Sequence, residues 1–322
     1  MSDRIELIKY VDRNSERSKI MINTSRTVNI ISIGVSGENQ NLPALLRLIE
    51  EENCEDSDLI ILPEMCLGYS IIGMNDEAVI KICETAGRKG VYIVFTVFRY
   101  GDNGETYNTS ILIDPRGNIA GIYNKVYPFW GEGFPDPPCL PGKDVPVFET
   151  DFGKIGISNC FDVNFPDVYK RLFDLGAELV LYPSGYSAGM SLQAHAINHN
   201  YYIISSTLTP DCVMYDITGQ EIYYQKGANG VNISRLTVDL DRSIFHFDLN
   251  LAKRDKLLTD HANKIEQDTC LERESWFTLR AIKPGASVKK IAAEYRLEEL
   301  SHYKKRKSGE LDELRGFSLR SL

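Results

Sequence analysis

A glutamate, a lysine and a cysteine each follow an apolar run of the chain, at positions where strands are expected to end. Glu64 closes LIILPE, Lys125 follows GIYN, and Cys160 lies within GISNCFD. A thiol is a nucleophile, a carboxylate can accept its proton, and an ammonium group can stabilise negative charge on a substrate oxygen. If the fold brings them together, these residue types could support nucleophilic catalysis by the cysteine.

Each of these residues also has a simpler interpretation. Cysteine is among the most buried residue types, and an ordinary charge is common at the end of a strand. Cys160 nevertheless stands at a strand-to-helix junction, since Pro166 and Asp167 suit the first turn of a helix and Gly176 suits its end. Backbone N–H groups at such a helix start would favour the thiolate.

A metal centre is not expected. His195 and His199 have the spacing of two zinc ligands, but HAINH lacks the glutamate of H-E-x-x-H, so we expect a surface or subunit-contact role for them. The seven cysteines are scattered without C-x-x-C spacing, which argues against a structural zinc site and against a disulfide framework. We expect neither a metal nor a redox cofactor.

The elements that must position these residues are short apolar strands separated by amphipathic helices. Strands are expected over residues 28–35, 58–63, 91–98, 109–114, 154–158, 178–183, 201–207 and 212–218. Helical spacing of apolar residues occurs over 42–49, 79–86 and 168–175. The sequences DPRGN and DITGQ are typical of hairpin turns, so the mixture indicates an α/β fold with helices outside a sheet sandwich.

Composition bounds the location and the partners. The first residues, MSDRIELIKYVDRNSERSK, lack the apolar region of a secretory signal, and no run approaches the roughly 18 apolar residues of a membrane span, so we expect a cytoplasmic protein with no membrane partner. The net charge of −9 opposes binding to nucleic acid. From about residue 250 the sequence becomes polar and helix-prone; its ASVKKIAAEYRLEELSHYKKR segment faintly resembles a helix-turn-helix, although packing on the main domain or on a neighbouring subunit is favoured.

The three reactive residues and their flanking motifs together resemble the Glu-Lys-Cys triad of the nitrilase superfamily, the carbon–nitrogen hydrolases. Supporting segments follow in the same order over 107–125, 151–162 and 175–187. The resemblance covers residues 27–250 and implies a four-layer α-β-β-α sandwich that assembles into a homodimer or a higher homo-oligomer. The chain would then comprise an N-terminal segment (1–26), this catalytic domain and a helical C-terminal extension (251–322).

The resemblance also implies roles for individual residues. Cys160 would attack the substrate and form a thioester, Glu64 would act as general base, and Lys125 with the Phe161 N–H would stabilise the tetrahedral intermediate. Glu132 matches a second glutamate that helps to position the triad or the substrate. The expected substrate-binding residues are Trp130, Phe161, Asp162 and Tyr186.

The sequence after the nucleophile favours one branch of the superfamily. Residues 160–167 read CFDVNFPD, which is similar to amidases and N-carbamoyl amide hydrolases, whereas nitrilases resemble C-W-E at this point. The expected activity is hydrolysis of a small linear amide or N-carbamoyl compound; the alternatives are a nitrilase and a noncatalytic binding or regulatory protein. One departure is HAINH (195–199), where the family commonly shows R-A-I-E-N, which puts in doubt any substrate specificity or dimer contact carried by that helix.

Overall fold

The computed structural model describes residues 26–52, 56–133 and 137–318, and these residues form two compact units. The larger unit spans Val28–Leu240, and the smaller one begins at Asp241. The segment expected over residues 1–26 lies outside the described residues, apart from Arg26. The boundary expected at residue 250 therefore falls about ten residues earlier, in front of a strand that belongs to the smaller unit.

The first sheet of the larger unit has seven strands in the order β13-β1-β2-β4-β5-β6, with β3 paired to β4. Its strands are β1 (Thr27–Val35), β2 (Leu59–Ile61), β3 (Ile71–Ile72), β4 (Tyr92–Tyr100), β5 (Thr106–Ile113), β6 (Ile119–Asn124) and β13 (Val231–Asp239). β1, β2 and β4 run parallel, whereas β4, β5 and β6 form antiparallel hairpins. The expected DPRGN turn joins β5 to β6, where Asn118 N–H donates to Asp114 Oδ1 at 2.8 Å.

The second sheet has six strands in the order β12-β11-β10-β9-β8-β7. Its strands are β7 (Val147–Glu149), β8 (Lys154–Ile157), β9 (Leu179–Ser184), β10 (Tyr202–Thr207), β11 (Asp211–Tyr215) and β12 (Glu221–Lys226). The central strands β8, β9 and β10 are parallel and the outer pairs are antiparallel. Buried side chains on both faces of β9 and β10 account for their continuous apolar sequences.

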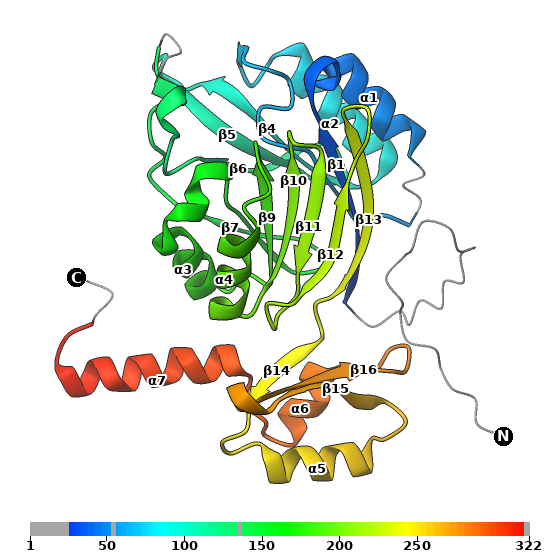
Figure 1. The fold of residues 1–322 in the computed structure, drawn as a ribbon, viewed down its shortest axis with the longest axis vertical. Helices are drawn as coiled ribbons and strands as arrows, with labels where there is room; N and C mark the ends of the chain where they lie inside the picture. The colour runs from blue at the N-terminus through cyan, green and yellow to red at the C-terminus, as the bar shows by residue number, and fades with distance from the viewer. Residues whose placement is uncertain (1–25, 53–55, 134–136, 319–322) are drawn as a thin grey trace. The chain divides into compact units, whose positions relative to one another are not determined.

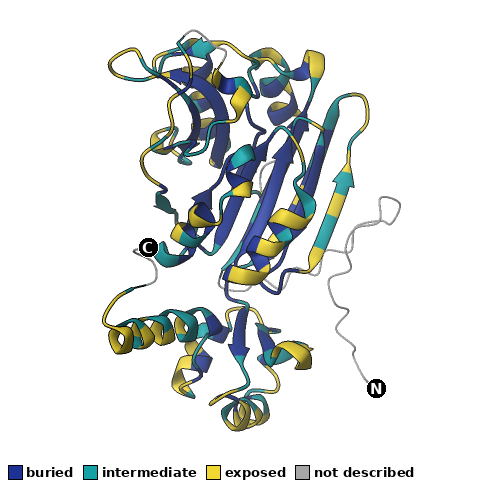
Figure 2. Ribbon diagram, turned by 60° about the vertical axis from the view of Figure 1, so that its left-hand side comes forward, coloured by how far each residue is buried: buried dark blue, intermediate teal, exposed yellow. Residues whose placement is uncertain are grey.

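The two sheets face each other, and helices cover their outer sides (Figure 1; Figure 2). Two hydrogen bonds of 2.8 Å join the sheets, from Ser32 Oγ to the Ser205 carbonyl and from Ser206 Oγ to the Ile33 carbonyl. Helices α1 (Leu42–Glu51) and α2 (Glu77–Lys89) pack on the first sheet, and α3 (Pro166–Leu175) and α4 (Gly189–His199) lie together beside the second. The expected four-layer sandwich is confirmed.

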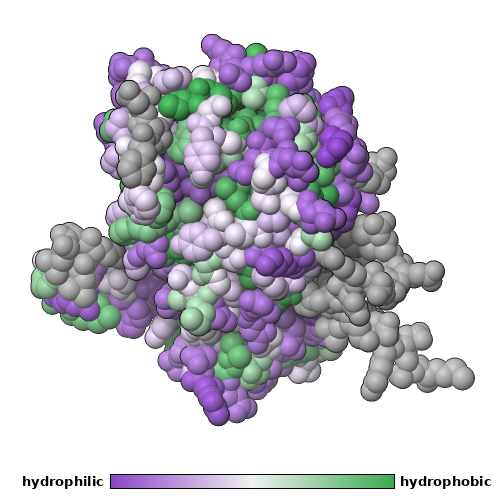
Figure 3. Space-filling model, turned by 45° about the horizontal axis from the view of Figure 1, so that its top comes forward, coloured by the Kyte–Doolittle hydropathy of each residue, from purple (hydrophilic) through white to green (hydrophobic). Residues whose placement is uncertain are grey.

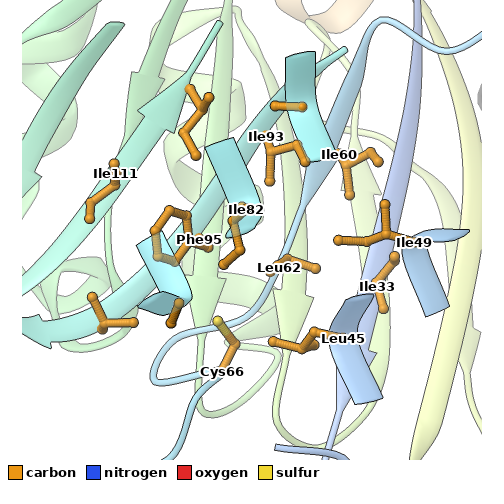
Figure 4. Packing of buried hydrophobic residues seen from close by; sticks show 14 of the residues in the cluster. Ile33, Leu45, Ile49, Ile60, Leu62, Cys66, Ile82, Ile93, Phe95 and Ile111 are labelled. Atoms are coloured by element: carbon orange, nitrogen blue, oxygen red, sulfur yellow. The ribbon is translucent and has the colours of Figure 1, made fainter. Parts of the chain in front are cut away.

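Local sequence explains where the helices over the first sheet begin and end. The Asn41 side chain accepts the Ala44 N–H at 3.0 Å and so caps α1, while Asp76 caps α2 through the Ala78 N–H at 2.9 Å. Gly90 ends α2 in the left-handed region at φ 67°, which a glycine adopts without steric cost. The apolar faces of both helices then pack against β1, β2, β4 and β5 in one continuous core (Figure 4).

The smaller unit corrects the expectation of a helical extension. Its three strands, β14 (Ser243–His246), β15 (Ile265–Leu271) and β16 (Trp276–Ala281), form an antiparallel sheet in the order β14-β16-β15. Its helices are α5 (Leu251–Asp260), α6 (Val288–Glu294) and α7 (Leu300–Arg315). β15 escaped the prediction because it is largely half-buried, IEQDTCL, so it lacks the apolar run on which the strand expectations depended.

The described helices and the surface drawn in Figure 3 are relevant to the expectation that the protein has no membrane partner. None of the described helices is both long and apolar enough to cross a bilayer. The face drawn in Figure 3 mixes hydrophilic and hydrophobic side chains, and the hydrophobic ones gather in separate groups.

Candidate active site

Glu64, Lys125, Glu132 and Cys160 meet where strands of both sheets end. Glu64 and Lys125 follow β2 and β6 of the first sheet, and Cys160 begins a single turn of 3-10 helix, η3 (Cys160–Asn164), after β8 of the second. Lys125 Nζ lies 2.8 Å from Glu64 Oε1 and also contacts Glu132 Oε1. Cys160 Sγ and Glu64 Oε2 both lie beside Gly185, at 4.0 Å and 3.6 Å from a Cβ added to that glycine. The structure thus brings together the four residues that the sequence singled out for catalysis.

The two oxygens of Glu64 have different surroundings. Oε1 accepts hydrogen bonds from Lys125 Nζ and from Asn108 Nδ2, each at 2.8 Å. Oε2 lies on the side of Gly185, where a Cβ added to that glycine would be 3.6 Å from Oε2 and 4.0 Å from Cys160 Sγ. One oxygen is therefore fixed by two donors, which leaves the other to face the thiol.

Two asparagine side chains form a chain of hydrogen bonds that ends at Glu64, and this chain was not predicted from the sequence. Asn159 Nδ2 donates to Asn108 Oδ1 at 2.9 Å, and Asn108 in turn donates to Glu64. Both asparagines are buried. A signal was present, because Asn108 interrupts the strand sequence TYNTSILI and asparagine is depleted in strands unless a specific contact holds it there.

Lys125 is a buried ammonium between two carboxylates. Burial alone would lower the pKa of Lys125, but the charges of Glu64 and Glu132 raise it well above its ordinary value. The lysine is 1% exposed, so the charge is stable only because these partners surround it. Lys125 therefore remains positively charged over the whole working range of pH.

Glu132 lies in the short helix η2 (Trp130–Gly133) and is 5% exposed. Burial raises the pKa of Glu132, while Lys125 opposes that rise. Its Oε1 contacts Lys125, but its Oε2 has no hydrogen-bond partner among the described residues. Two carboxylates thus face one ammonium, and one carboxylate oxygen is left without a donor.

Cys160 has a strained backbone and a neutral thiol. Its φ of 48° is in the left-handed region, which costs a non-glycine residue about 1–2 kcal/mol. The Tyr182 hydroxyl donates to the Cys160 carbonyl at 2.9 Å and holds the turn. Burial, followed by the charge of Glu64, raises the pKa of the Cys160 thiol to about 12. The expectation that a helix start favours the thiolate is therefore wrong for the free protein, because burial beside a carboxylate outweighs the backbone N–H groups.

Asp162 does not fit the expected role in substrate binding. It is fully buried, and its oxygens accept hydrogen bonds from Tyr123 Oη at 2.6 Å, from the Asn159 N–H at 2.9 Å and from the Tyr127 N–H at 2.9 Å. Burial raises the pKa of Asp162 to about 6, against the opposing effect of these donors. Asp162 lies in η3, the turn that begins with Cys160, and the hydrogen bonds that it accepts from Tyr123 and Tyr127 join this turn to the segment that contains Lys125. Asp162 therefore helps to position the reactive residues and does not contact substrate.

The three aromatic residues expected to bind substrate keep exposed surface near the reactive group. Trp130 is 71% and Tyr186 40% exposed, and Phe161 is partly exposed. The ring of Phe129 lies 5.2 Å from that of Trp130 and 5.6 Å from that of Phe161. Phe161 follows Cys160 and Tyr186 follows Gly185 in the chain, so both residues adjoin the reactive group along the backbone.

The histidines of HAINH are buried in the chain itself, which corrects the expectation of a surface or subunit-contact role. The ring of His195 stacks on Tyr169 at 3.6 Å, and its Nε2 lies 2.9 Å from the Val163 carbonyl in the nucleophile turn. His199 Nδ1 lies 2.9 Å from the His195 carbonyl. Burial lowers the pKa of His195, so the neutral ring donates to Val163. Within the described residues no group of three or more potential ligands could hold a metal ion.

Comparison with known proteins places this geometry in a family. The family model for carbon–nitrogen hydrolases matches residues 27–241. A deaminated glutathione amidase of Synechocystis sp. is 30% identical over 200 residues, which cover 53% of this chain and 72% of the relative. An omega-amidase of Danio rerio is 27% identical over 161 residues, covering 46% of this chain and 58% of the relative.

Solved structures agree at the level of the fold. A nitrilase-superfamily member from Saccharomyces cerevisiae superposes with a TM-score of 0.58 at 19% identity, over 66% of this chain and 90% of that one. The match of the family model covers well over half of the sequence, including all four clustered residues. The chain therefore belongs to the carbon–nitrogen hydrolase family.

Proposed function

We propose that this enzyme hydrolyses the carbon–nitrogen bond of a small linear amide or N-carbamoyl compound through a thioester on Cys160. The proposal rests on the different surroundings of the two Glu64 oxygens. Lys125 and Asn108 donate hydrogen bonds to Oε1, and Oε2 is left beside the thiol. A carboxylate held in this way can take the proton of the attacking sulfur without losing its position. Relatives named as amidases support the same reaction class.

In the first half of the reaction Glu64 takes the thiol proton as Sγ attacks the substrate carbonyl carbon. A thiol with a pKa of about 12 gains most from such a base, because almost no thiolate exists before the substrate binds. The new oxyanion would be stabilised by Lys125 and by the Phe161 N–H. The carbon–nitrogen bond then breaks, and the departing nitrogen takes the proton from Glu64 and leaves as ammonia or an amine.

In the second half Glu64 takes a proton from water, which attacks the thioester carbonyl. The carbon–sulfur bond breaks, the carboxylic or carbamic acid leaves, and Cys160 recovers its proton. Lys125 has three N–H groups, of which Glu64 and Glu132 engage two, so one remains for the oxyanion in both halves. Glu132 balances the charge of Lys125 and directs its ammonium group.

The aromatic residues favour a substrate in which the organic portion next to the scissile group carries no charge. Trp130, Phe161 and Tyr186 lie one or two residues along the chain from Glu132, Cys160 and Gly185, respectively. They offer partly exposed aromatic surface, which suits an alkyl or aryl portion of the substrate. The sequence after Cys160 favours an amide or ureido group over a nitrile. A nitrilase is the alternative, and it would convert the nitrile while leaving the matching amide intact.

The test compares wild type with Cys160→Ala on a panel of small amides, N-carbamoyl amines and nitriles, with ammonia release as the measurement. We expect release from at least one amide or N-carbamoyl compound and none in the variant. Conversion of nitriles alone would replace the proposed reaction by that of a nitrilase. Inert substrates together with an unreactive Cys160 would favour a noncatalytic binding protein.

Two expectations about the whole protein remain predictions. We propose a homodimer or a higher homo-oligomer, as the family resemblance implies, and a cytoplasmic location. Sedimentation of the purified chain measures the first, and a single protomer mass in solution would contradict it.

A further inference from the structure

The loop between β9 and α4 brings backbone directly against the reactive group. Gly185 in this loop lies so close that an added Cβ would be 3.6 Å from Glu64 Oε2 and 4.0 Å from Cys160 Sγ. The backbone N–H of Gly185 opposes the rise in the pKa of the Cys160 thiol. The position of this loop therefore affects how well negative charge on the sulfur is stabilised.

The loop is fixed on both sides of Gly185. Before it, the Ser184 carbonyl accepts the Leu208 N–H at 3.0 Å, and Ser184 Oγ accepts the Tyr186 N–H at 3.0 Å. After it, Ser187 Oγ donates to Asp211 Oδ2. Since Ser184 is the last residue of β9, the Ser187 hydroxyl is the side-chain anchor on the helix side of the loop.

Asp211 is a buried carboxylate whose oxygens serve two segments. It is 3% exposed and begins β11. Its Oδ1 accepts the hydroxyls of Thr207 and Thr209 in the preceding turn, the latter at 3.4 Å. Its Oδ2 accepts Ser187. A buried carboxylate is costly unless donors surround it, and among the donors to Asp211 are hydroxyls of its own turn and the Ser187 hydroxyl of the active-site loop.

We propose that Asp211 is a positioning residue of this hydrolase: through the Ser187 hydroxyl it holds Gly185 against Cys160. The inference rests on the proposed function, because it assigns Asp211 a part in forming the thioester. When Glu64 takes the proton, negative charge develops on a sulfur that lies beside the backbone of Gly185. A loop freed from Asp211 would present the Gly185 N–H less often, and attack would slow.

The test is Ser187→Ala, which removes the anchor without touching the reactive group. Ser187 is only partly buried, so its hydroxyl can be removed without opening a cavity in the core. We expect kcat for the preferred amide to fall by about 10- to 100-fold with KM nearly unchanged, as for a small displacement of a catalytic geometry. We also expect slower alkylation of Cys160 by iodoacetamide, followed by mass spectrometry of the peptide that contains it. Ser187→Thr, which keeps the hydroxyl, is expected to restore both rates.

A matched control removes the same kind of bond elsewhere. Thr218 Oγ1 donates to the buried carboxylate of Asp216 at 2.6 Å, in the hairpin at the far end of β11. Thr218→Ala is expected to leave kcat and alkylation at the wild-type rates. The proposal is overturned if folded Ser187→Ala matches wild type in both rates, or if Thr218→Ala slows them equally.

Two further arms keep the result decisive. If Ser187→Ala does not fold, Asp211→Asn takes its place: it offers one acceptor oxygen where the carboxylate offers two, so the same slowing is expected, and a wild-type rate would overturn the proposal. If wild type hydrolyses no compound of the panel, the proposed function fails, and the alkylation rates alone decide whether Asp211 positions Gly185.

Discussion

Two groups of buried side chains meet behind Cys160, and they use carboxylates in opposite ways. In the charge cluster (Glu64, Lys125, Glu132) the two carboxylates face a single ammonium, and Lys125 and Asn108 hold Glu64 by Oε1, which leaves Oε2 beside the thiol. In the Asp162 network the carboxylate accepts three hydrogen bonds from neutral donors, two of them backbone N–H groups. Both groups are almost entirely buried.

The difference separates chemistry from support. A carboxylate whose oxygens are filled by fixed donors holds the chain but has nothing left for a substrate or a proton. A carboxylate with an oxygen left over can accept a proton during the reaction, at a cost in stability that its neighbours offset. Changes in the charge cluster should therefore lower the rate, and also the stability where a buried charge loses its partner, whereas changes in the Asp162 network should mainly lower the free energy of unfolding.

The largest expected effect comes from Glu64→Gln. The amide oxygen can still accept Lys125 and Asn108, so the cluster keeps its shape while the base is lost. We expect kcat/KM for the preferred amide to fall by about 10²–10⁴-fold, the contribution of a general base. Steady-state ammonia release measures the fall, and thermal unfolding close to that of wild type serves as the control. Activity close to wild type would contradict the role of Glu64.

Lys125→Met tests the charge balance of the same cluster. Methionine fills the space but leaves the carboxylates of Glu64 and Glu132 buried without a counter-charge. We expect unfolding in urea to require about 3–5 kcal/mol less free energy, as when one partner of a buried ion pair is removed. The exposed pair of Lys81 and Glu84, 3.4 Å apart on α2, is the matched control, and Lys81→Met is expected to cost at most about 1 kcal/mol. Equal losses in the two variants would show that burial does not set the strength of the Lys125 contacts.

The sequence predicted much of the larger unit because its strands are continuous apolar runs that end in ionisable residues. Glu64, Lys125 and Cys160 could be found since each keeps its own local motif. The contacts that orient them could not be predicted, because these contacts join residues distant in sequence. Asn108 is 44 positions from Glu64, and His195 is 32 positions from Val163.

The misplaced roles share a physical cause. Asp162 was expected to bind substrate, and His195 was expected to have a surface or subunit-contact role. In the fold, hydrogen bonds from Tyr123 and two backbone N–H groups stabilise Asp162, and a stacked tyrosine with one carbonyl stabilises His195. Sequence patterns report apolar burial directly, but they report buried polar groups only when the donors are neighbours along the chain.

Asp162→Asn tests whether the Asp162 network mainly supports the stability of the fold. The amide NH₂ group would face a donor at one of the three positions where the carboxylate accepts, so at least one buried donor loses its partner. We expect the free energy of unfolding to fall by about 1–3 kcal/mol, with a smaller fall in kcat/KM than for Glu64→Gln. The control is Asp167→Asn, because Asp167 is exposed and accepts the Tyr127 hydroxyl at 2.5 Å. If Asp162→Asn lost its rate while keeping its stability, Asp162 would belong to the reactive group after all.

The smallest effect is expected from His195→Phe, because His195 contacts the turn that begins with Cys160 through a single hydrogen bond to the Val163 carbonyl. Phenylalanine can keep the stack on Tyr169, but the Val163 carbonyl loses its donor, so we expect a loss of about 1 kcal/mol in the free energy of unfolding near neutral pH. The direction of its pH dependence follows from burial, which lowers the pKa of His195 below the ordinary value of 6.5. As the pH falls through 6.5, the unfolded chain takes up a proton at this histidine before the folded chain does.

Protonation of the unfolded state therefore removes stability from wild type at acidic pH and removes none at this position from the phenylalanine variant. The difference between the two proteins should shrink as the pH falls, which urea unfolding at a series of pH values would measure. His302→Phe, at an exposed position on α7, is the matched histidine substitution and, because it removes no buried hydrogen bond, should change the free energy of unfolding less. A difference that grows on acidification would mean that the folded protein stabilises the charged ring, and the neutral donor assigned to Val163 would be wrong.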